Sequence, residues 1–455
     1  MTVRSYLNQF KAIKKKDMKQ QVSAEIEPEP PSTGDGLLAG NYFKDEAKGF
    51  HIHKPFFTCT EKHELDQVAD FRQRHFPEVS LKSWNDWRWQ LKNRICRAGD
   101  LKKYLRLSPE EEAAISLENL LPLSITPYYM SLVHETESKD PVRKCVIPTE
   151  QELFRSPGEE DDPLHEDRDS PVPGIVHRYP DRVLFLVTGF CSTYCRYCTR
   201  SRIVGQRGVY GTERWDQGIE YVQRNRQVRD VLISGGDPLT MSDDHLEYLL
   251  RGLRQIRHVE IIRIGSKVPA VLPQRINSKL CAMLRKYHPL FLSLHFTHPR
   301  ELTGESMEAC SRLAQAGIPL GSQTVLLKDI NDDPGIMKAL NHRLLQARVR
   351  PYYLYQCDPV PGSVHFRTTM EKGLEVIRSL RGHTSGYAVP QYVIDLPGGG
   401  GKIPVLPAYY QGMSEQGLEF KNFENQVYVY PENAGRNDCS GANLVSAHIY
   451  AGGKQ

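Results

Sequence analysis

Three cysteines on one short segment are the residues whose spacing most directly predicts chemistry in this chain. They stand in Cys191-Ser-Thr-Tyr-Cys195-Arg-Tyr-Cys198, a C-x3-C-x2-C pattern, directly after the apolar run Val183–Val187. Such a run is typical of a buried strand, and the loop that leaves the C-terminal end of a strand is where α/β barrels carry their active sites. Three thiolates on one loop can hold three irons of a [4Fe–4S] cluster and leave the fourth iron open to another ligand.

Two other uses of these cysteines stay open on spacing alone. A structural zinc ion needs four protein ligands, commonly as two separated pairs, and the sequence shows no second pair. A disulfide would join two of the three cysteines and leave one unpaired. Ten cysteines in 455 residues suit a reducing cytoplasm better than a disulfide framework, so we favour the cluster.

Four glycines followed by a lysine form the second segment that could do chemistry. It reads Asp395-Leu-Pro-Gly398-Gly-Gly-Gly401-Lys402. Glycines leave backbone N–H groups unobstructed, which suits an anion such as phosphate. The residue after Lys402 is Ile rather than Ser or Thr, so the segment is not a Walker A loop. A lysine beside a phosphate site suits pyridoxal phosphate (PLP), whose aldehyde forms a Schiff base with lysine. A purely structural loop is the competing interpretation.

Further polar residues follow or lie within other apolar runs. They are the turn Ser234-Gly235-Gly236-Asp237, His295, Gln323 and Asp358. Arg200 comes two residues after the last cysteine, where its planar guanidinium can bind a carboxylate through two hydrogen bonds. Each of these residues, taken singly, also has a structural interpretation as a turn, a cap, a hydrogen-bonding side chain or an ion pair.

The elements that would position these residues alternate between strands and helices. Apolar runs predict strands at 183–187, 228–233, 260–264, 290–294, 320–326 and 352–355. Helical patterns lie between them, for example at 244–256, 278–286 and 306–316. Six strand–helix units in succession predict a parallel sheet that curls into a barrel.

Composition shifts along the chain predict four parts. We expect a flexible polar tail over residues 1–50, a mainly helical region over 51–177, the barrel over 178–366, and a C-terminal segment with Lys402 and a tail over 367–455. Within the helical region, Ser108-Pro-Glu-Glu111 is a predicted helix start with a capping serine. The tryptophans at 84, 87 and 89 are expected to pack on neighbouring helical turns.

Charge and hydropathy exclude several classes of protein. Lys and Arg total 59 against 55 acidic residues, a formal charge of +4, which gives no reason to expect nucleic acid as a partner. We expect no membrane span, because no run of 18 apolar residues occurs. The N-terminus is polar and lysine-rich without the apolar core of a secretory signal, so we expect a cytoplasmic protein.

Taken together, these motifs resemble a known family. The cysteine pattern after a first strand is similar to that of radical S-adenosylmethionine (SAM) enzymes, and residues from about Trp84 to Pro407 resemble the lysine 2,3-aminomutases. The resemblance implies an α/β fold: a radical SAM partial (βα)6 TIM-like barrel with an N-terminal helical region and a C-terminal PLP-lysine segment. It also implies three cofactors, namely a [4Fe–4S] cluster, SAM and PLP, an electron donor such as flavodoxin or ferredoxin, and a homo-oligomer.

The resemblance assigns roles to individual residues. It implies that Cys191, Cys195 and Cys198 bind the cluster; that Lys402, Arg178, Gly398, Gly399, Gly400 and Gly401 bind PLP; that Gly235, Gly236, Asp237, His295 and Gln323 bind SAM; and that Arg200, Asp358 and Asp395 bind substrate. The implied reaction moves the α-amino group of an amino acid to C3, with L-lysine giving L-β-lysine. The two aspartates would hold the side-chain ammonium, since two carboxylates around one pocket repel unless a cation lies between them.

The sequence also departs from this family. Where relatives have a cysteine in an Asn-Asp-Cys-Pro turn, this chain has Asn331-Asp-Asp-Pro334, and its tail carries only Cys439, so we expect no structural zinc. After Asp358 the chain reads Pro-Val-Pro-Gly-Ser, which differs from the family pattern at the predicted pocket. Three alternatives therefore stay open: an arginine 2,3-aminomutase, a radical SAM enzyme with a different outcome and no PLP, and a noncatalytic cluster-binding or electron-transfer protein.

Overall fold

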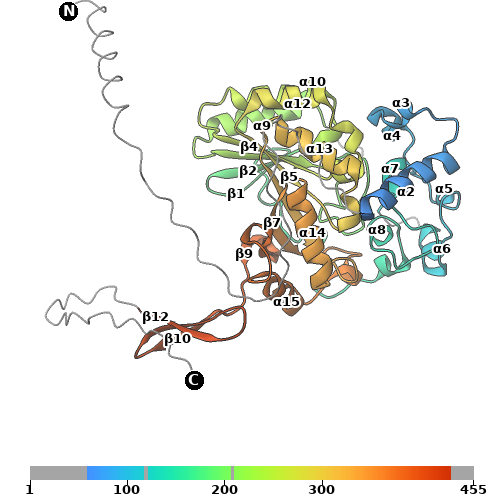
Figure 1. The fold of residues 1–455 in the computed structure, drawn as a ribbon. Helices are drawn as coiled ribbons and strands as arrows, with labels where there is room; N and C mark the ends of the chain where they lie inside the picture. Colours follow the sequence, from blue (N-terminus) through green and yellow to red (C-terminus); the bar gives the residue numbers. More distant parts are fainter. Residues whose placement is uncertain (1–58, 117–120, 206–209, 432–455) are drawn as a thin grey trace, which may run out of the picture. The chain divides into compact units, whose positions relative to one another are not determined.

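The structure is a computed structural model that describes residues 59–116, 121–205 and 210–431. At its centre is a nine-stranded sheet in which the spatial order of the strands equals their order in the chain (Figure 1). The strands are β1 (Ile175–Tyr179), β2 (Arg182–Thr188), β3 (Asp230–Gly235), β4 (Ile261–Ser266), β5 (Leu290–Leu294), β6 (Leu320–Leu326), β7 (Arg350–Gln356), β8 (Gln391–Leu396) and β9 (Gly401–Pro404).

Strands β2 to β8 are parallel, whereas β1 and β9 are antiparallel to their neighbours and form the two edges. Each of the six predicted strands overlaps one of β2 to β7, so the predicted partial barrel is confirmed. It is extended by β8, a further parallel strand. The sheet continues through β8 and β9 beyond residue 366, where the sequence suggested a boundary. Among the described strands β1 and β9 do not pair with each other, and the barrel stays open between them.

Helices connect successive parallel strands and cover the outside of the sheet (Figure 1). The longer ones are α9 (Thr212–Arg224), α10 (Asp243–Arg254), α12 (Ser278–Leu284), α13 (Gly304–Gln315), α14 (Pro334–Gln346) and α15 (Met370–Leu380), and the short α11 (Val268–Val271) follows β4. In α10, Leu246, Leu249, Leu250 and Leu253 are all buried, which is the helical spacing that turns one apolar face to a sheet. The Ser242 hydroxyl caps this helix by accepting from the backbone N–H of His245.

Strand periodicity decides which side chains face the interior of the barrel. In β3, Val231 and Ile233 are fully buried, while Asp230, Leu232 and Ser234 line an internal cavity. Successive side chains of a strand point to opposite faces, so one set packs beneath the helices and the other set is left for binding. The barrel interior is therefore partly polar, unlike the layer beneath the helices.

The N-terminal region consists of one long helix and several short ones, which pack on one another and on the barrel. They are α2 (Cys59–His75), α3 (Leu81–Trp84), α4 (Trp87–Lys92), α5 (Ala98–Leu101), α6 (Pro109–Ile115), α7 (Pro127–Met130) and α8 (Pro141–Lys144). The predicted start of α6 is confirmed, since Ser108 and Glu111 form a reciprocal capping box. The buried Arg143 guanidinium binds Glu111 at 2.6 Å and donates to the carbonyls of His134 and Arg106 at 2.8 and 2.9 Å, which ties these helices together.

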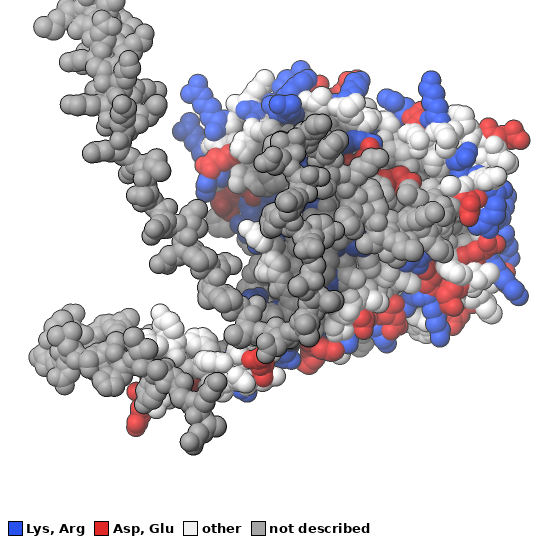
Figure 2. All heavy atoms as spheres, viewed as in Figure 1, with Lys and Arg blue, Asp and Glu red and all other residues white. Residues whose placement is uncertain are grey.

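A second, three-stranded antiparallel sheet follows the barrel and was not predicted. It comprises β10 (Tyr410–Ser414), β11 (Gly417–Lys421) and β12 (Val427–Tyr430). The predicted tail over residues 1–50 and Cys439 lie outside the described residues. Of the helices that are described, none has both the length and the hydrophobicity needed to cross a bilayer. Figure 2 shows Lys and Arg interspersed with Asp and Glu over the face in view, without a continuous basic surface.

Candidate active site

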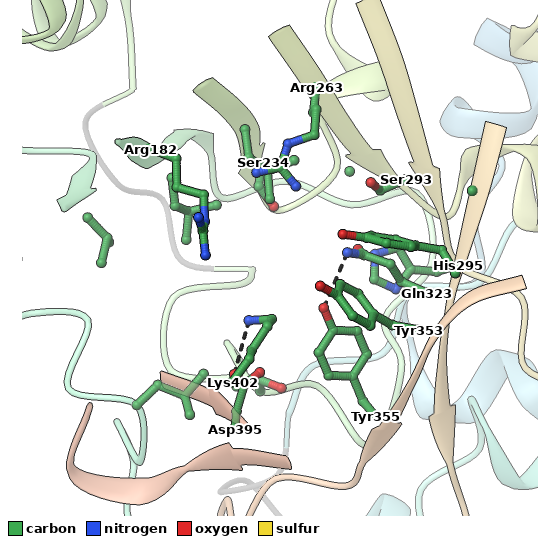
Figure 3. Close-up of a pocket in the computed structure, with 18 of the residues that line it drawn as sticks. Arg182, Ser234, Arg263, Ser293, His295, Gln323, Tyr353, Tyr355, Asp395 and Lys402 are labelled. Atoms are coloured by element: carbon green, nitrogen blue, oxygen red, sulfur yellow. Dashed lines mark hydrogen bonds and ion pairs between the residues drawn. The ribbon is translucent and has the colours of Figure 1, made fainter. Parts of the chain in front are cut away.

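The barrel encloses a cavity of about 780 Å³, lined by residues of all nine strands and of the loops at their ends. Figure 3 shows Lys402 and Asp395 on one side of this cavity and His295, Gln323, Tyr353 and Tyr355 projecting toward it. The cavity brings together eight residues for which the sequence predicted a role: Arg178, Arg200, His295, Gln323, Asp358, Asp395, Gly401 and Lys402. The three cysteines and the turn Gly235–Asp237 are not among its lining residues.

Cys191, Cys195 and Cys198 lie on the loop that follows β2. Burial raises the pKa of each thiol, to about 11 for Cys198, and the charges of the other cysteines raise those of Cys191 and Cys198 further. Buried thiols of this kind ionise only when a cation such as iron compensates the charge, so the donor set fits a metal group. Among the described residues no three His, Cys, Asp or Glu side chains form a single-ion site. In a [4Fe–4S] cluster each thiolate binds a different iron, so convergence on one point is not required.

The N-terminal region fixes this cysteine loop in place. The buried Arg196 side chain forms a salt bridge with Glu152, and its backbone N–H donates to the Cys145 carbonyl at 2.9 Å. The Ser124 hydroxyl donates to the Ser192 carbonyl at 3.1 Å. These bonds span 44 to 68 residues of chain and are largely removed from water, where a hydrogen bond is stronger and its loss more costly.

The Gly235–Asp237 turn lies against the start of the cysteine loop. Gly235 has φ +128°, and a Cβ there would come within 2.2 Å of the Thr188 carbonyl oxygen, so only glycine fits. The Asp237 carboxylate accepts from the Ser266 hydroxyl and from the Lys267 backbone N–H, each at 2.7 Å. Burial nevertheless raises the pKa of Asp237 to about 6, which these hydrogen bonds oppose. The aspartate therefore holds the shape of the turn.

His295 and Gln323 reach the cavity from β5 and β6 (Figure 3). Burial, followed by the positive charge of Lys267, lowers the pKa of His295 to about 4, so its imidazole is neutral near pH 7. The Gln323 amide donates to the Tyr355 hydroxyl at 3.3 Å. A neutral imidazole and an amide can hydrogen-bond a cationic ligand without repelling it.

Lys402 and Asp395 face each other across the β8–β9 hairpin. They are register partners in this antiparallel pair, and the Lys402 Nζ lies 3.0 Å from Asp395 Oδ1 (Figure 3). The Lys402 backbone N–H donates to the Tyr179 hydroxyl at 2.9 Å, and its Nζ lies 5.4 Å from the centre of the Tyr355 ring. The hairpin thus directs the predicted lysine into the cavity and pairs it with one predicted aspartate.

The glycine run that precedes Lys402 passes close to two arginines. Gly399 has φ +84°, and a Cβ there would lie 2.5 Å from Arg168 Nη2 and 2.9 Å from Arg178 Nη1. Arg168 donates to the Gly398 carbonyl at 3.2 Å, and Arg178 forms a salt bridge with Asp169 at 2.6 Å. Two guanidinium groups beside an unobstructed backbone are a donor set that fits a phosphate group.

Arg200 lines the cavity but is already engaged by an acid that the sequence did not single out. Its Nε and Nη2 donate to the two Glu166 carboxylate oxygens at 2.7 to 3.1 Å. Burial would lower the pKa of Arg200, but Glu166 outweighs burial and raises it. These bonds occupy one edge of the guanidinium, and the edge formed by Nη1 makes no hydrogen bond to the described residues.

Asp358 follows β7 and is largely buried beside the other predicted substrate residues. The Thr199 hydroxyl donates to its Oδ2 at 2.6 Å. Burial raises the pKa of Asp358 to about 6, and the charge of Asp395 adds to this effect, whereas Thr199 and the cations Lys402 and Arg200 oppose it. The two aspartates are therefore close enough for their charges to repel each other.

Known proteins resemble this chain in sequence over most of its length. Residues 185–339 match the family model of the radical SAM superfamily, and residues 377–453 match that of lysine-2,3-aminomutase. The L-lysine 2,3-aminomutase of Fusobacterium nucleatum is 54% identical over 82% of this chain and 88% of its own length, and that of Clostridium subterminale is 53% identical over 79% and 87%. The chain belongs to the lysine 2,3-aminomutase family.

Membership in this radical SAM family implies a [4Fe–4S] cluster and SAM, and it makes the protein an aminomutase, an isomerase. The family contains more than one named activity. The glutamate 2,3-aminomutase of Clostridioides difficile is 42% identical to this aminomutase over 76% of this chain and 82% of its own length. The substrate therefore has to be argued from the pocket of this chain.

Two groups of residues around the site were missed from the sequence. Glu166 lies in the polar segment 162–182, and no role was predicted for it; the available signal was the dense run of acids in this segment together with the Arg-x-Arg pair at 200 and 202. Lys267 and Glu301 form a buried salt bridge of 2.7 Å behind the cysteine loop. Nothing in their local sequence indicates burial, because the barrel topology alone brings the ends of β4 and β5 together.

Proposed function

We propose that this aminomutase converts L-lysine to L-β-lysine with a [4Fe–4S] cluster, SAM and PLP. The observation that carries the substrate assignment is the contact between the Lys402 ammonium and Asp395 at 3.0 Å, beside the buried Asp358. Asp395 thus already binds a lysine-type ammonium in this cavity. Relatives named L-lysine 2,3-aminomutase support the same assignment.

Cys191, Cys195 and Cys198 would bind the cluster on the loop after β2. The turn of Gly235, Gly236 and Asp237 would hold the amino group of SAM, and His295 and Gln323 would contact the rest of that molecule from β5 and β6. When bound, the cluster and SAM supply a carbon radical that removes a hydrogen atom, and PLP supplies an aldehyde that carries the migrating amino group. The neutral His295 suits the neighbourhood of a sulfonium cation, because it adds no repulsive charge.

Lys402 would be the residue that attaches PLP, since its side chain points into the cavity from β9. Arg178 would bind the phosphate, together with the backbone of Gly398, Gly399, Gly400 and Gly401. The close approach of Gly399 to Arg178 and Arg168 supports this assignment, because a side chain at Gly399 would fill the space between the backbone and the guanidinium groups.

Arg200 would bind the substrate α-carboxylate through the guanidinium edge that Glu166 leaves available. Glu166 would then hold the orientation of that guanidinium. At the other end of the substrate, Asp358 and Asp395 would share the side-chain ammonium. The site would thus fix both ends of the substrate and leave C2 and C3 between them, which is the orientation that a hydrogen transfer at C3 needs.

Arginine is the nearest competing substrate, because a guanidinium also satisfies two aspartates. Glutamate would place a third carboxylate beside Asp358 and Asp395, and this repulsion disfavours it. The length of the side chain distinguishes lysine from arginine, and the turn after Asp358, stiffened by prolines at 359 and 361, would set the position of Asp358.

The proposal also covers partners, cellular location and structural metal. We propose a one-electron donor of the flavodoxin or ferredoxin class, a homo-oligomer, a cytoplasmic location, and no structural zinc. Metal analysis of protein purified without added zinc tests the last point, and one tightly held zinc per chain would contradict it.

An anaerobic competition assay tests the substrate assignment. Reconstituted enzyme with SAM, PLP and a reductant is given lysine, arginine and glutamate together, and the β-amino acids are resolved by mass. We expect β-lysine as the main product of the wild type and a loss of that preference in Asp395→Asn. A preference for arginine would overturn the substrate, and a preference for glutamate would overturn the roles of Asp358 and Asp395.

A further inference from the structure

A threonine on the cysteine loop contacts one of the two cavity aspartates, and no role was predicted for it from the sequence. Thr199 lines the cavity, and its hydroxyl donates to Asp358 Oδ2 at 2.6 Å. The two residues are 159 positions apart, so the bond joins the loop after β2 to the loop after β7. Thr199 lies directly between Cys198 and Arg200, one a proposed cluster ligand and the other the proposed binder of the α-carboxylate.

The backbone at Asp358 is held independently of this bond. The Asp358 carbonyl accepts from the Val360 N–H at 2.9 Å and from the hydroxyl of the fully buried Ser363 at 3.0 Å. The turn is also tied to a neighbouring segment, because the Pro359 carbonyl accepts from the Glu160 N–H at 3.1 Å. Asp358 therefore keeps only the rotation of its own side chain, which is limited to a few rotamers. The bond to the threonine hydroxyl selects one of them.

This bond also determines which oxygen is left for a ligand. An ionised carboxylate can only accept, so the threonine hydroxyl is the donor. Asp358 Oδ2 is occupied by that hydroxyl, whereas Oδ1 makes no hydrogen bond to the described residues. Because Asp358 lines the cavity, the arrangement leaves Oδ1 for an ammonium that enters it.

The Thr199 hydroxyl also favours the charged form of this carboxyl group. It lowers the pKa of Asp358, against the larger opposing effect of burial. Other ionisable groups act on Asp358 from the surrounding elements or lie beside it, namely Asp395 of β8, Lys402 of β9, Arg200 of the cysteine loop, Tyr355 of β7 and the adjacent Cys357. Removal of the hydroxyl leaves all of these groups in place.

The opposite end of the proposed substrate site is fixed through the neighbouring residue. Glu166 holds the Arg200 guanidinium through Nε and Nη2. Consecutive Cα atoms are only about 3.8 Å apart, so the residue that binds the α-carboxylate and the residue that holds Asp358 move together. The separation between the two substrate-binding groups thus depends on a single side-chain hydrogen bond.

We propose that Thr199 fixes Asp358 at a constant distance from Arg200 and thereby sets the length of the amino acid that the site accepts. The proposal rests on the proposed function, in which Arg200 binds the α-carboxylate and Asp358 the side-chain ammonium. Thr199 is a positioning residue, because it acts through Asp358. L-ornithine has one methylene fewer than lysine, and its ammonium falls short of a carboxylate held in this way. A misplacement of about 1 Å at a reacting site can cost 10²-fold in rate.

Anaerobic assays of reconstituted enzyme with L-lysine and with L-ornithine test the proposal. Thr199→Val keeps the shape of the side chain and removes the donor. We expect its preference for lysine over ornithine in kcat/KM to fall by about tenfold, with KM for lysine rising more than kcat falls. The acid limb of kcat/KM should move to higher pH by about one unit, because the carboxylate loses a bond that favours its charged form. Iron, sulfide and PLP content should match the wild type.

Two further substitutions at the same position make the test specific. Thr199→Ser keeps the hydroxyl and should retain both the preference for lysine and the acid limb. Thr199→Ala removes the donor in a smaller side chain and should reproduce the changes of Thr199→Val. A matched control is Thr324→Val on β6, where the buried hydroxyl donates to the Phe296 carbonyl at 3.0 Å and the preference and acid limb should stay unchanged.

The outcomes separate this proposal from the proposed function. A wild-type preference for lysine and a wild-type acid limb in both Thr199→Val and Thr199→Ala, with complete cofactors, would overturn the role of Thr199. Equal changes in Thr199→Ser or in Thr324→Val would overturn it as well, because they would show a general loss of packing. An unchanged kcat/KM for lysine in Asp358→Asn would instead overturn the substrate site of the proposed function.

Discussion

The cysteine loop (residues 189–200) and the glycine–lysine segment (residues 396–404) both contribute residues to the same cavity, but different contacts hold them in place. The cysteine loop is enclosed by the N-terminal helical region, and the Arg196–Glu152 salt bridge that anchors it is almost completely buried. The glycine–lysine segment lies at the edge of the sheet, on the β8–β9 hairpin.

Anchors of the glycine–lysine segment are closer to solvent. Its bonds to the rest of the protein include Gly398 N–H to the Pro163 carbonyl at 2.9 Å and Lys402 N–H to the Tyr179 hydroxyl at 2.9 Å, and the Lys402 side chain is 35% exposed. A metal cluster needs ligands held at fixed positions, whereas a lysine that exchanges its covalent partner needs freedom to move. The difference fits the proposed roles, in which the cysteine loop holds the cluster at a fixed position and Lys402 changes its covalent partner.

The largest effects are expected from substitutions of the cysteines in the cysteine loop. Changing Cys191, Cys195 or Cys198 to Ala removes one of three cluster ligands, and we expect loss of cluster absorbance and of all SAM cleavage in each variant. Iron and sulfide analysis with a SAM cleavage assay measures both. Full iron and sulfide in all three variants would contradict the assignment.

Lys402→Ala should affect the glycine–lysine segment and leave the cysteine loop intact. Turnover should fall to background and the absorbance of lysine-bound PLP should disappear, because no other amine is placed on β9 to attach the cofactor, while the iron content of the cluster loop stays at the wild-type value. Borohydride reduction followed by peptide mapping identifies the modified lysine. Trapping of PLP on a different lysine would show that the segment has another role.

Much of this architecture was predictable from the sequence, for physical reasons that differ between elements. Strand β2 contains the continuous apolar run Val183–Val187, in which all residues but Leu184 are buried, so its position was predicted within a few residues. The cysteine pattern and Gly398–Lys402 are contiguous, and their chemistry is readable without knowledge of the fold. Strand β8 was missed because Gln391–Leu396 mixes polar and apolar residues, and only Tyr392 and Val393 are buried in it.

Residues that act through long-range contacts were not predictable. The partner of Arg200 is Glu166, 34 residues earlier, and the partner of Lys267 is Glu301, 34 residues later. The first pair joins the segment before β1 to the cysteine loop, and the second forms because the barrel brings the ends of β4 and β5 together. Charged residues in isolation are normally expected on the surface. Local sequence therefore identifies the groups that do chemistry but not the groups that hold them.

Arg196→Gln removes an anchor of the cysteine loop and leaves the glycine–lysine segment unchanged, so it tests whether the two regions are held differently. The change leaves the Glu152 carboxylate buried without its cation, which costs about 3–5 kcal/mol of unfolding free energy, and cluster loading should fall. Arg168→Gln is the matched control beside the glycine segment, where a side chain that is 60% exposed should change stability by less than about 0.5 kcal/mol. Urea unfolding of the two variants gives both values, and equal destabilisation would contradict the difference between the regions.

Asp358→Asn should affect substrate binding without changing either cofactor region. The Thr199 hydroxyl can still donate to the amide oxygen, but the carboxylate charge that faces the substrate ammonium is lost. We expect kcat/KM for lysine to fall by about 10²–10³-fold, the equivalent of a few kcal/mol for an unpaired buried charge. Cluster content and PLP absorbance should match the wild type. An unchanged kcat/KM would remove Asp358 from the substrate site.

The smallest effect should appear in the pH dependence, and it too depends on Asp358. Burial, reinforced by Asp395, raises the pKa of Asp358 to about 6 in the free enzyme. Below that pH its carboxyl group is neutral and no longer attracts a cation, so kcat/KM for lysine should fall with decreasing pH, approaching tenfold per unit. His295, with a pKa of about 4, stays neutral over the same range and should not contribute.

Because kcat/KM reports ionisations of the free enzyme, this acid limb belongs to Asp358 only if it disappears in Asp358→Asn. Activity measured between pH 5 and 8 in both enzymes, with cluster content checked at each pH, separates titration of the aspartate from loss of the cluster. A limb of equal size in Asp358→Asn would assign the titration to another group, and an activity that rises toward acid would contradict the requirement for a carboxylate at the cation end of the pocket.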